Sequence, residues 1–430
     1  MRRLTVLQLS NWPGKRRRSC FVKSSAEAIP EDAVARPGGT PGEVFAAFLK
    51  LGLTSFGGPI AHLGYFRDEL VVRRKWIDEA GYGDLVALCQ FLPGPASSQV
   101  GLALGLLRAG PLGALAAWAA FTLPSAILLV IFAMAATAFD GPVGSGLLHG
   151  LKIVAVAVVA QAVWGMAKSL TPDRERAGIA LAAVLIVIIS AGAIGQIAAI
   201  SAGALAGLVL CRNGPVTGET HLSFRVSRSF GIACLIAFFA LLGVLPVVAS
   251  ASGSQGLSLF DAFYRSGALV FGGGHVVLPL LQAEVVNPGW MTNDTFLAGY
   301  GAAQAVPGPL FTFAAYLGAV VGPAPNGLLG ASICLIAVFL PGFLLLLGAL
   351  PFWDSFRKRP TAQAAMRGAN AAVVGILGAA LYSPVWTSAV LKPYDFALAL
   401  TGFILLVVWK APPWIVVVLL AAGGTLLHVM

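Results

Sequence analysis

Long apolar runs dominate the chain, and polar residues are confined to short stretches between them. An α-helix rises about 1.5 Å per residue, so about 20 apolar residues cross the roughly 30 Å hydrocarbon core of a bilayer. Five runs have this length, and each predicts one membrane-spanning helix: residues 112–138, 147–167, 229–251, 326–349 and 364–383.

Two other regions predict pairs of helices. The uncharged run 177–211 is too long for one span, so we expect a tight helical hairpin that turns near Gly192 to Gly195. The C-terminal tail contains two apolar segments, 394–409 and 413–428, which Lys410 and two prolines separate. These regions add four predicted spans.

Four remaining segments have an apolar pattern that is interrupted in the middle. Residues 43–66 and 258–282 contain Phe-Gly-Gly there, and residues 80–108 and 295–322 contain Pro-Gly-Pro. Glycine and proline both interrupt helices, so we expect each segment to be a broken or re-entrant helix.

Composition narrows the class of protein. Of the 430 residues, 58% are hydrophobic and 11% are charged, and the mean hydropathy is +0.85. Soluble domains carry about 25% charged residues, so a soluble globular enzyme is excluded. The pattern predicts an all-α polytopic membrane protein in a lipid bilayer. The net charge of +10 comes from basic loops, which orient membrane proteins, so we expect no nucleic-acid partner.

The sequence lacks signatures of bound cofactors or of catalysis. Its five cysteines have no paired spacing, and no Walker A, H-E-x-x-H or G-x-S-x-G motif occurs. We therefore expect no cofactor, no metal and no catalytic residue, and we interpret the chain as a protein that is not an enzyme.

The four interrupted segments form two copies of one pattern. Five residues of the first copy recur at an offset of 215, with Lys50 falling on Arg265: Phe48, Gly52, Phe56, Gly57 and Gly58 match Phe263, Gly267, Phe271, Gly272 and Gly273. At an offset of 214, Gln90 matches Gln304, and the Pro-Gly-Pro around Gly94 matches the one around Gly308. Two ordered motifs at nearly one separation indicate an internal duplication.

The loop charges indicate that the two copies are inverted. Loop 67–79 carries four basic residues, whereas its counterpart 283–293 has none. Loop 139–146 has none, whereas its counterpart 350–363 carries three. Because basic loops face the cytoplasm, equivalent loops with opposite charge lie on opposite sides. Inverted repeats are common in secondary transporters.

The same rule favours re-entrant hairpins. Both the arm before residue 43 and the loop after residue 66 are basic, which a single span between them would contradict. A hairpin folded at Gly57-Gly58-Pro59 keeps both ends in the cytoplasm. We therefore expect an inner or plasma membrane protein with a cytoplasmic N-terminus. The expected organisation is a basic disordered arm (1–42), a first repeat (43–211), a cytoplasmic linker (212–228) and a second repeat with an extra leading helix (229–430).

The broken segments suggest an anion site. A helix that starts inside the membrane points N–H groups with partial positive charge at the break, and glycine lets an oxyanion approach them. No acidic residue accompanies Lys50 or Arg265 at the equivalent depth, so we expect both cations to be unpaired until a ligand binds. The predicted ligand is a small, multiply charged oxyanion. The candidate substrate-binding residues are Lys50, Gly57, Gly58, Gln90, Gly94, Arg265, Gly272, Gly273, Gln304 and Gly308.

Other interpretations compete at these positions. A second interpretation of Lys50 and Arg265 is that their long side chains reach out to the membrane surface. Gln90 and Gln304 suit polar contacts between helices as well as hydrogen bonds to an oxyanion. His62 and His275 follow the two glycine motifs, and each suits either a structural role or a gating or proton-linked one.

The motifs resemble those of a known family. F-x-K-x-G-x-x-x-F-G-G-P (48–59), R-R-K-W-I-D (73–78) and Q-F-L-P-G-P (90–95) resemble the chromate ion transporter family, and F-G-G-G-H (271–275) and Q-A-V-P-G-P (304–309) are similar to its second domain. The resemblance implies the long, two-domain form, which exports chromate from the cytoplasm and confers chromate resistance. It leaves the N-terminal arm unexplained.

The sequence therefore predicts a secondary transporter that exports chromate, driven by the membrane potential or by ion coupling. Two alternatives remain open, namely a sulfate or general oxyanion transporter and an anion channel. The substrate is expected to be chromate or sulfate, and the sequence carries no signature of an oligomeric state.

Overall fold

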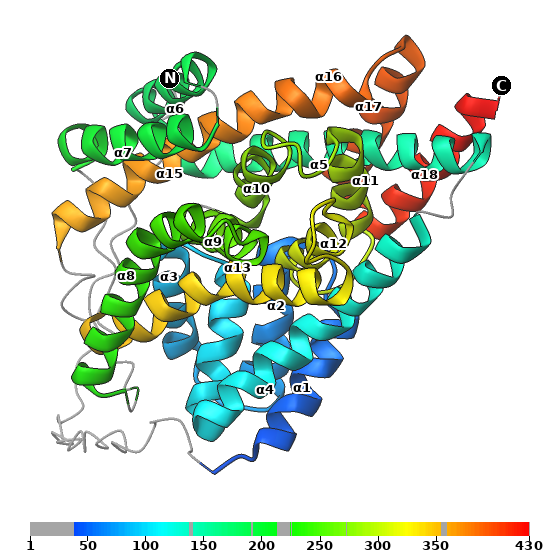
Figure 1. Ribbon diagram of the computed structural model, residues 1–430. Coiled ribbons are helices and arrows are strands. Elements are labelled where there is room, and N and C mark those ends of the chain that lie inside the picture. Colours follow the sequence, from blue (N-terminus) through cyan, green and yellow to red (C-terminus); the bar gives the residue numbers. More distant parts are fainter. Residues whose placement is uncertain are drawn as a thin grey trace, which may run out of the picture. The chain divides into compact units, whose positions relative to one another are not determined.

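The computed structural model describes residues 38–136, 141–190, 192–212, 224, 226–271, 273–353 and 359–429, and every regular element in them is helical (Figure 1). The predicted all-α fold is confirmed. The first 37 residues of the expected arm and most of the expected linker 212–228 lie outside the described residues, as does Gly272.

The first repeat contains two interrupted segments followed by longer helices. Its elements are α1 (Pro41–Thr54), α2 (Gly58–Phe66), η1 (Arg67–Arg73), α3 (Glu79–Phe91), α4 (Ala96–Ala136), α5 (Pro142–Leu170), α6 (Arg174–Ile189) and α7 (Ala193–Leu210). Gly110, with φ of 68°, divides α4 into a first part that ends the second interrupted segment and a second part that spans. The predicted hairpin in 177–211 is present as α6 and α7.

The second repeat begins with an extra helix and then follows the same order. Its elements are α8 (Arg228–Ser252), α9 (Gln255–Ala268), η2 (Gly274–Val276), α10 (Val277–Val285), α11 (Asn293–Ala303), η3 (Leu310–Thr312), α12 (Phe313–Val320), α13 (Gly327–Ala349), η4 (Leu350–Phe352), α15 (Pro360–Ala380), η5 (Leu381–Trp386), α16 (Thr387–Ala389), α17 (Pro393–Val407) and α18 (Pro413–Val429). The two tail helices, α17 and α18, have 15 and 17 residues and are therefore shorter than an average span.

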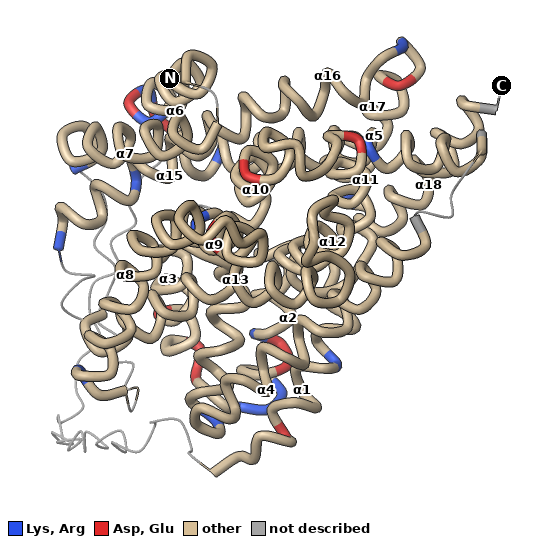
Figure 2. The backbone as a smooth tube through the Cα atoms, viewed as in Figure 1, with Lys and Arg blue, Asp and Glu red and all other residues tan. Residues whose placement is uncertain are grey.

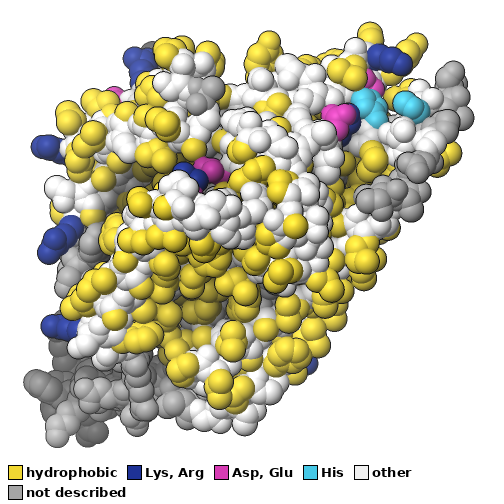
Figure 3. Space-filling model, viewed as in Figure 1, with side chains coloured by type: hydrophobic (Ala, Val, Ile, Leu, Met, Phe, Trp, Pro, Cys, Tyr) yellow, Lys and Arg dark blue, Asp and Glu magenta, His cyan; other side chains and the backbone are white. Residues whose placement is uncertain are grey.

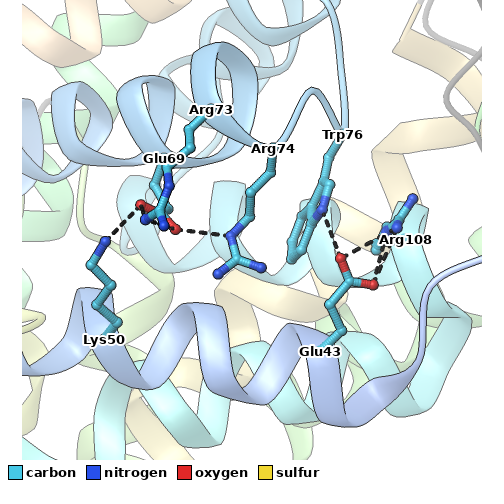
Figure 4. A network of polar contacts seen from close by, with 7 residues as sticks. All are labelled: Glu43, Lys50, Glu69, Arg73, Arg74, Trp76 and Arg108. Carbon is cyan, nitrogen blue, oxygen red and sulfur yellow. Dashed lines mark hydrogen bonds and ion pairs between the residues drawn. The ribbon is translucent and has the colours of Figure 1, made fainter.

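The interrupted segments of the first repeat fold back as re-entrant hairpins. The indole of Trp76, after the first hairpin, donates a hydrogen bond to Glu43 at its start, over 3.2 Å. Arg108, at the end of the second hairpin, pairs with the same carboxylate at 3.1 Å (Figure 4). All ends of both hairpins therefore meet at one side of the protein, which we call the first face.

The second repeat closes its hairpins in the same way. The amide of Gly322, at the end of the second hairpin, donates to the carbonyl of Trp290 at its beginning, over 2.9 Å. These positions are the 214-residue equivalents of Arg108 and Trp76. Gly256, where the first hairpin begins, adjoins Pro325, just after the second. We call this side the second face.

The order of the helices places the two faces on opposite sides of the membrane. Between the hairpins of the first repeat and those of the second, the described chain crosses with the second part of α4 and then with α5, α6, α7 and α8. An odd number of crossings puts α9 on the side opposite to α1, so the repeats are inverted. This agrees with the prediction from the loop charges.

Long helices of one repeat pack on those of the other. In Figure 1, α18 lies along α5 and α7 lies along α15. Both contacts depend on glycine, because a Cβ atom on Gly150 would lie 2.7 Å from Cα of Ala421, and one on Gly368 would lie 2.7 Å from Cα of Gly207. Small residues let helix backbones approach closely where lipid supplies no hydrophobic driving force.

The surface matches a bilayer environment. Six helices among the described residues are long and apolar enough to span a membrane, within 96–135, 143–170, 193–210, 228–252, 327–352 and 360–389. Hydrophobic side chains cover much of the face that Figure 3 shows, and Figure 2 shows that most charged positions lie near helix ends. Cys89, Cys211, Cys234 and Cys334 are free and buried.

A close contact between the two repeats gives a stability prediction. Gly94 has φ of 123°, and an added Cβ would lie 2.9 Å from Cα of Gly342. Gly94→Ala should lower the free energy of unfolding by roughly 2 kcal/mol or more, because it adds both backbone strain and overpacking. Thermal unfolding in detergent measures the effect. Gly243→Ala is the control, since its Cβ would meet nothing within 4 Å, and an equal melting temperature for both variants would contradict the prediction.

Candidate functional site

The four breaks in the interrupted segments meet inside the protein. Gly274, in the second Phe-Gly-Gly break, lies against Pro59 of the first, and also against Phe311, which follows the second Pro-Gly-Pro. The position of a Cβ on Gly58 is 3.8 Å from Nε2 of His275. We call this meeting point the junction.

Two equivalent backbone hydrogen bonds hold the junction together. The amide of Gly94 donates to the carbonyl of Val270 over 2.7 Å, and the amide of Gly308 donates to the carbonyl of Ser55 over 2.9 Å. Gly94 and Gly308 are equivalent at an offset of 214, and Ser55 and Val270 at 215. Each Pro-Gly-Pro loop thus binds the break of the opposite repeat. In this conformation, these two amides donate to protein carbonyls.

The glycines of the Phe-Gly-Gly breaks are accessible, unlike the bound amides of Gly94 and Gly308. Gly57 is exposed, and Gly58 and Gly273 are partly exposed, whereas Ser55 and Gly274 on either side are buried. Gly57 and Gly58 have φ of 101° and 81°, which L side chains rarely adopt. The N-terminus of α2 has no side-chain cap. Accessible amides therefore lie at the start of a helix at the junction.

Several buried polar atoms near the junction have no hydrogen-bond partner among the described residues. They belong to short hydroxyl side chains, to an imidazole and to an amide: Ser55 Oγ, His62 Nε2, Ser98 Oγ, Thr122 Oγ1, Ser266 Oγ and Gln304 Nε2. Unsatisfied buried polar atoms are costly, so their concentration beside the breaks is a signal of a ligand or of water.

The two histidines lie at the junction with different partners. His62 is buried, its Nδ1 is 3.4 Å from the hydroxyl of Ser97, and its ring meets Phe121 edge-on. Nδ1 of His275 is 2.8 Å from the hydroxyl of Tyr300. Each ring is therefore held by a polar contact at Nδ1, and Nε2 of His275 lies at the Gly58 break.

The equivalent glutamines occupy unequal positions. Gln90 is exposed at the end of α3, whereas Gln304 is partly buried after α11, beside the loop that binds Ser55. The two side chains therefore do not share one environment, and of the two, Gln304 is the one with a buried amide nitrogen that has no partner among the described residues.

Lys50 belongs to an ion-pair network at the first face. Its ammonium lies 2.8 Å from Glu69, and Arg73 and Arg74 bind the same carboxylate at 2.9 and 2.8 Å (Figure 4). The side chain of Lys50 is 51% exposed, whereas that of Glu69 is only 8% exposed. The expectation that Lys50 is unpaired is wrong.

Arg265 is paired as well. Its guanidinium lies 2.8 Å from Asp261, one turn earlier on α9, and 2.9 Å from Glu284 on α10. The expectation of an unpaired cation is therefore wrong at both positions. Glu69 and Glu284 were missed because they lie 19 residues beyond their partners, outside the motifs. The offset of 215 relates these glutamates to each other, so the repeat itself contained the signal.

The charges around Glu69 fix its protonation state. Burial alone would raise its pKa, but hydrogen bonds from Lys50, Arg74 and Arg73 outweigh burial and lower the pKa to about 2. The side chain is therefore ionised at physiological pH. The network holds one carboxylate against three cations, so it keeps a positive charge that can attract an anion.

A cavity of about 1,040 Å³ opens beside α5, α11, α17 and α18. An ion pair between Lys152 and Asp294, at 3.0 Å, lies across it, and a hydrogen-bond contact of 2.9 Å joins His149 to Asp395. The helix ends that line it belong to the second face. No sequence pattern indicates the contact between His149 and Asp395, because the two lie 246 residues apart.

No group of three or more histidine, cysteine, aspartate or glutamate side chains suited to a metal ion occurs in the described part of the chain.

Re-entrant hairpins in inverted repeats, with breaks that converge within a bundle of spans, define a membrane transport protein. The chromate transporter family model matches residues 42–208 and 257–425, so both repeats are covered. The chain belongs to the chromate transporter family. It is therefore a multi-pass membrane chromate transporter and not an enzyme.

Individual relatives agree with this assignment. The chain is 30% identical over 416 residues to a chromate transport protein of Pseudomonas aeruginosa, covering 94% of this chain and 95% of that protein. It is 29% identical to a probable chromate transport protein of Synechococcus elongatus over 340 residues (78% and 82%), and 28% identical to a chromate transport protein of Cupriavidus metallidurans over 339 residues (78% and 80%). No solved structure matches the chain.

The cation of the first network gives a functional prediction. Lys50→Gln should lower chromate transport by about tenfold or more, because it removes an accessible positive charge next to the junction. Initial rates in membrane vesicles, corrected for the amount of folded protein, measure the effect. Lys168→Gln is the control, since Lys168 is an exposed lysine that stacks on Trp164 at the end of α5. Equal rates in the two variants would remove Lys50 from the transport path.

Proposed function

We propose that this chain exports chromate from the cytoplasm through the junction, by alternating access between its inverted repeats. The observation that carries the proposal is the convergence of four broken helices, flanked on each side by an equivalent cation. A tetrahedral dianion needs several hydrogen-bond donors and positive charge around it, and this arrangement offers both.

The proposed substrate site combines backbone and side-chain donors. The accessible amides at Gly57 and Gly58, with Gly273 of the second repeat, form its centre, and Gln304 and His275 supply polar side chains beside it. Lys50 and Arg265 attract the dianion from the two sides. Gly94 and Gly308 join the repeats here, and their amides become available to the substrate only if the repeats separate. Gln90 lies at the margin of this site.

The proposed orientation follows from the charges of the first face. Loop 67–79 contains Arg67, Arg73, Arg74 and Lys75, and basic loops stay in the cytoplasm. The first face and the N-terminus are then cytoplasmic in the cell membrane, and the second face, with its cavity, is external.

Export in this orientation needs no ATP. At an inside-negative potential of about 100 mV, moving two negative charges outward gains roughly 5 kcal/mol. That free energy sustains a concentration ratio of more than about a thousandfold. The membrane potential is therefore a sufficient driving force for a dianion.

Sulfate is the second candidate substrate. It has the same tetrahedral shape and charge as chromate, and amides, hydroxyl groups and cations at the junction recognise both properties. Competition between the two ions therefore belongs in the test.

The direct test is uptake of radiolabelled chromate into everted vesicles that contain the protein. We expect accumulation that depends on the potential, ends when an ionophore collapses it, and persists with equimolar sulfate. Vesicles without the protein are the control. Absence of uptake would contradict the proposal, and complete displacement by a small amount of sulfate would identify a general oxyanion carrier instead.

Cysteine labelling tests the orientation. Asp68 and Asn287 are exposed at the first and second faces, whereas Leu70 nearby is buried and unsuitable. In a background without native cysteines, Asp68→Cys should react with an impermeant maleimide in everted vesicles only, and Asn287→Cys in intact cells. Labelling of both residues from one side would contradict the orientation.

A further inference from the structure

One ion pair occurs twice in the protein, once in each repeat. Lys50 lies 2.8 Å from Glu69, and Arg265 lies 2.9 Å from Glu284. Both members of the first pair map onto the second at an offset of 215. The duplication has therefore retained a cation and its carboxylate together, although the two are 19 residues apart in each copy.

The residues around the two pairs are not duplicated. Arg73 and Arg74, which bind Glu69, correspond to Pro288 and Gly289 in the second repeat. Asp261, which binds Arg265, corresponds to Ala46 in the first. The feature common to both repeats is thus the single cation–carboxylate pair, set among different neighbours.

Both pairs have the same position relative to the junction. Lys50 precedes Ser55 by five residues, and Arg265 precedes Val270 by five residues. Ser55 and Val270 are the two carbonyl acceptors of the cross-repeat hydrogen bonds. Five helical residues span about 7.5 Å along the axis, so each pair lies next to the junction, on its own side of the membrane.

A carboxylate and a tetrahedral oxyanion compete for the same cation. Both present oxygen atoms to an ammonium or guanidinium group, in the same hydrogen-bond geometry. The carboxylates are the buried partners, because Glu69 and Glu284 have side chains only 8% and 12% exposed. A buried carboxylate that loses its cation is destabilised, so it recovers the cation when the oxyanion moves on.

The two sides differ in net charge. The network around Lys50 and Glu69 at the first face contains three cations and one carboxylate, so its net charge is +2. The network around Arg265 and Glu284 at the second face contains one cation and two carboxylates, so its net charge is −1. A dianion is therefore attracted more strongly at the first face and released more readily at the second.

We propose that Glu69 and Glu284 are resident counter-anions, which the travelling oxyanion displaces from Lys50 and Arg265 at successive steps of transport. The inference rests on the proposed function and adds two residues that determine affinity, one for each side. Without the resident carboxylate, each cation would hold the dianion too long for rapid turnover.

The test is the Michaelis constant for chromate measured separately from each side. In everted vesicles, Glu69→Gln should lower KM by at least about fivefold and also lower Vmax, because the dianion meets no competitor and leaves slowly. Lys50→Gln should raise KM. With chromate presented to the second face, in right-side-out vesicles, Glu284→Gln should lower KM and Glu69→Gln should not.

Two variants serve as controls. Glu79→Gln removes an exposed carboxylate of the same region, which pairs with Arg67, and should leave KM unchanged. Glu69→Asp keeps the charge and should stay close to the unaltered protein, which separates loss of charge from loss of fold. Size-exclusion chromatography of a fluorescent fusion reports the folded amount of each variant.

Opposite shifts for Lys50→Gln and Glu69→Gln are the decisive result, since a purely structural ion pair would give the same defect from either side chain. Shifts in the same direction, or an unchanged KM in folded Glu69→Gln, would overturn this inference while leaving the proposed function intact. Absence of chromate uptake by the unaltered protein would overturn both.

Discussion

Two crossed hydrogen bonds at the junction determine the arrangement of the rest of the protein. Each broken helix ends in carbonyl groups that its own helix cannot satisfy, and in a membrane interior an unsatisfied backbone group costs several kcal/mol. The carbonyls of Ser55 and Val270 find their donors in Gly308 and Gly94 of the opposite repeat. The breaks must therefore lie together at the centre, and the long helices pack around them as crossed pairs, α5 with α18 and α15 with α7.

The charged side chains around this centre are less symmetric between the repeats than the backbone is. The backbone hydrogen bond at the junction occurs at equivalent positions in both repeats. Beside it, each repeat has the same cation–glutamate pair, but the other charged partners differ. Figure 4 shows the cation-rich version, in which Arg73 and Arg74 join Lys50 around Glu69. Arg265 instead faces two carboxylates. In the proposed alternating-access mechanism, backbone symmetry permits two equivalent states of access, and side-chain asymmetry makes them unequal in their affinity for an anion.

Much of the fold was predictable, because span length and repetition are strong signals in a membrane protein. The hairpin at Gly192 and the division of the chain at Gly110 follow from the local sequence. The pairing of Lys50 was not predicted, since its partner lies across a hairpin at a distance that no helical periodicity suggests. The hydrogen bond from the Gly94 amide was also not predictable, because its acceptor, the carbonyl of Val270, belongs to the other repeat. His149 and Asp395 illustrate the same limit, since only tertiary structure unites them.

The crossed bonds also have a consequence for the history of the chain. One repeat alone contains one glycine donor and one carbonyl acceptor, and in this structure each of them binds the other repeat instead of its own. A half-length protein would complete its centre only by pairing with a second copy inserted upside down in the same bilayer. Fusion of two such copies requires an odd number of crossings between them. The extra helix α8 makes that number odd, and so permits one polypeptide to replace an antiparallel dimer.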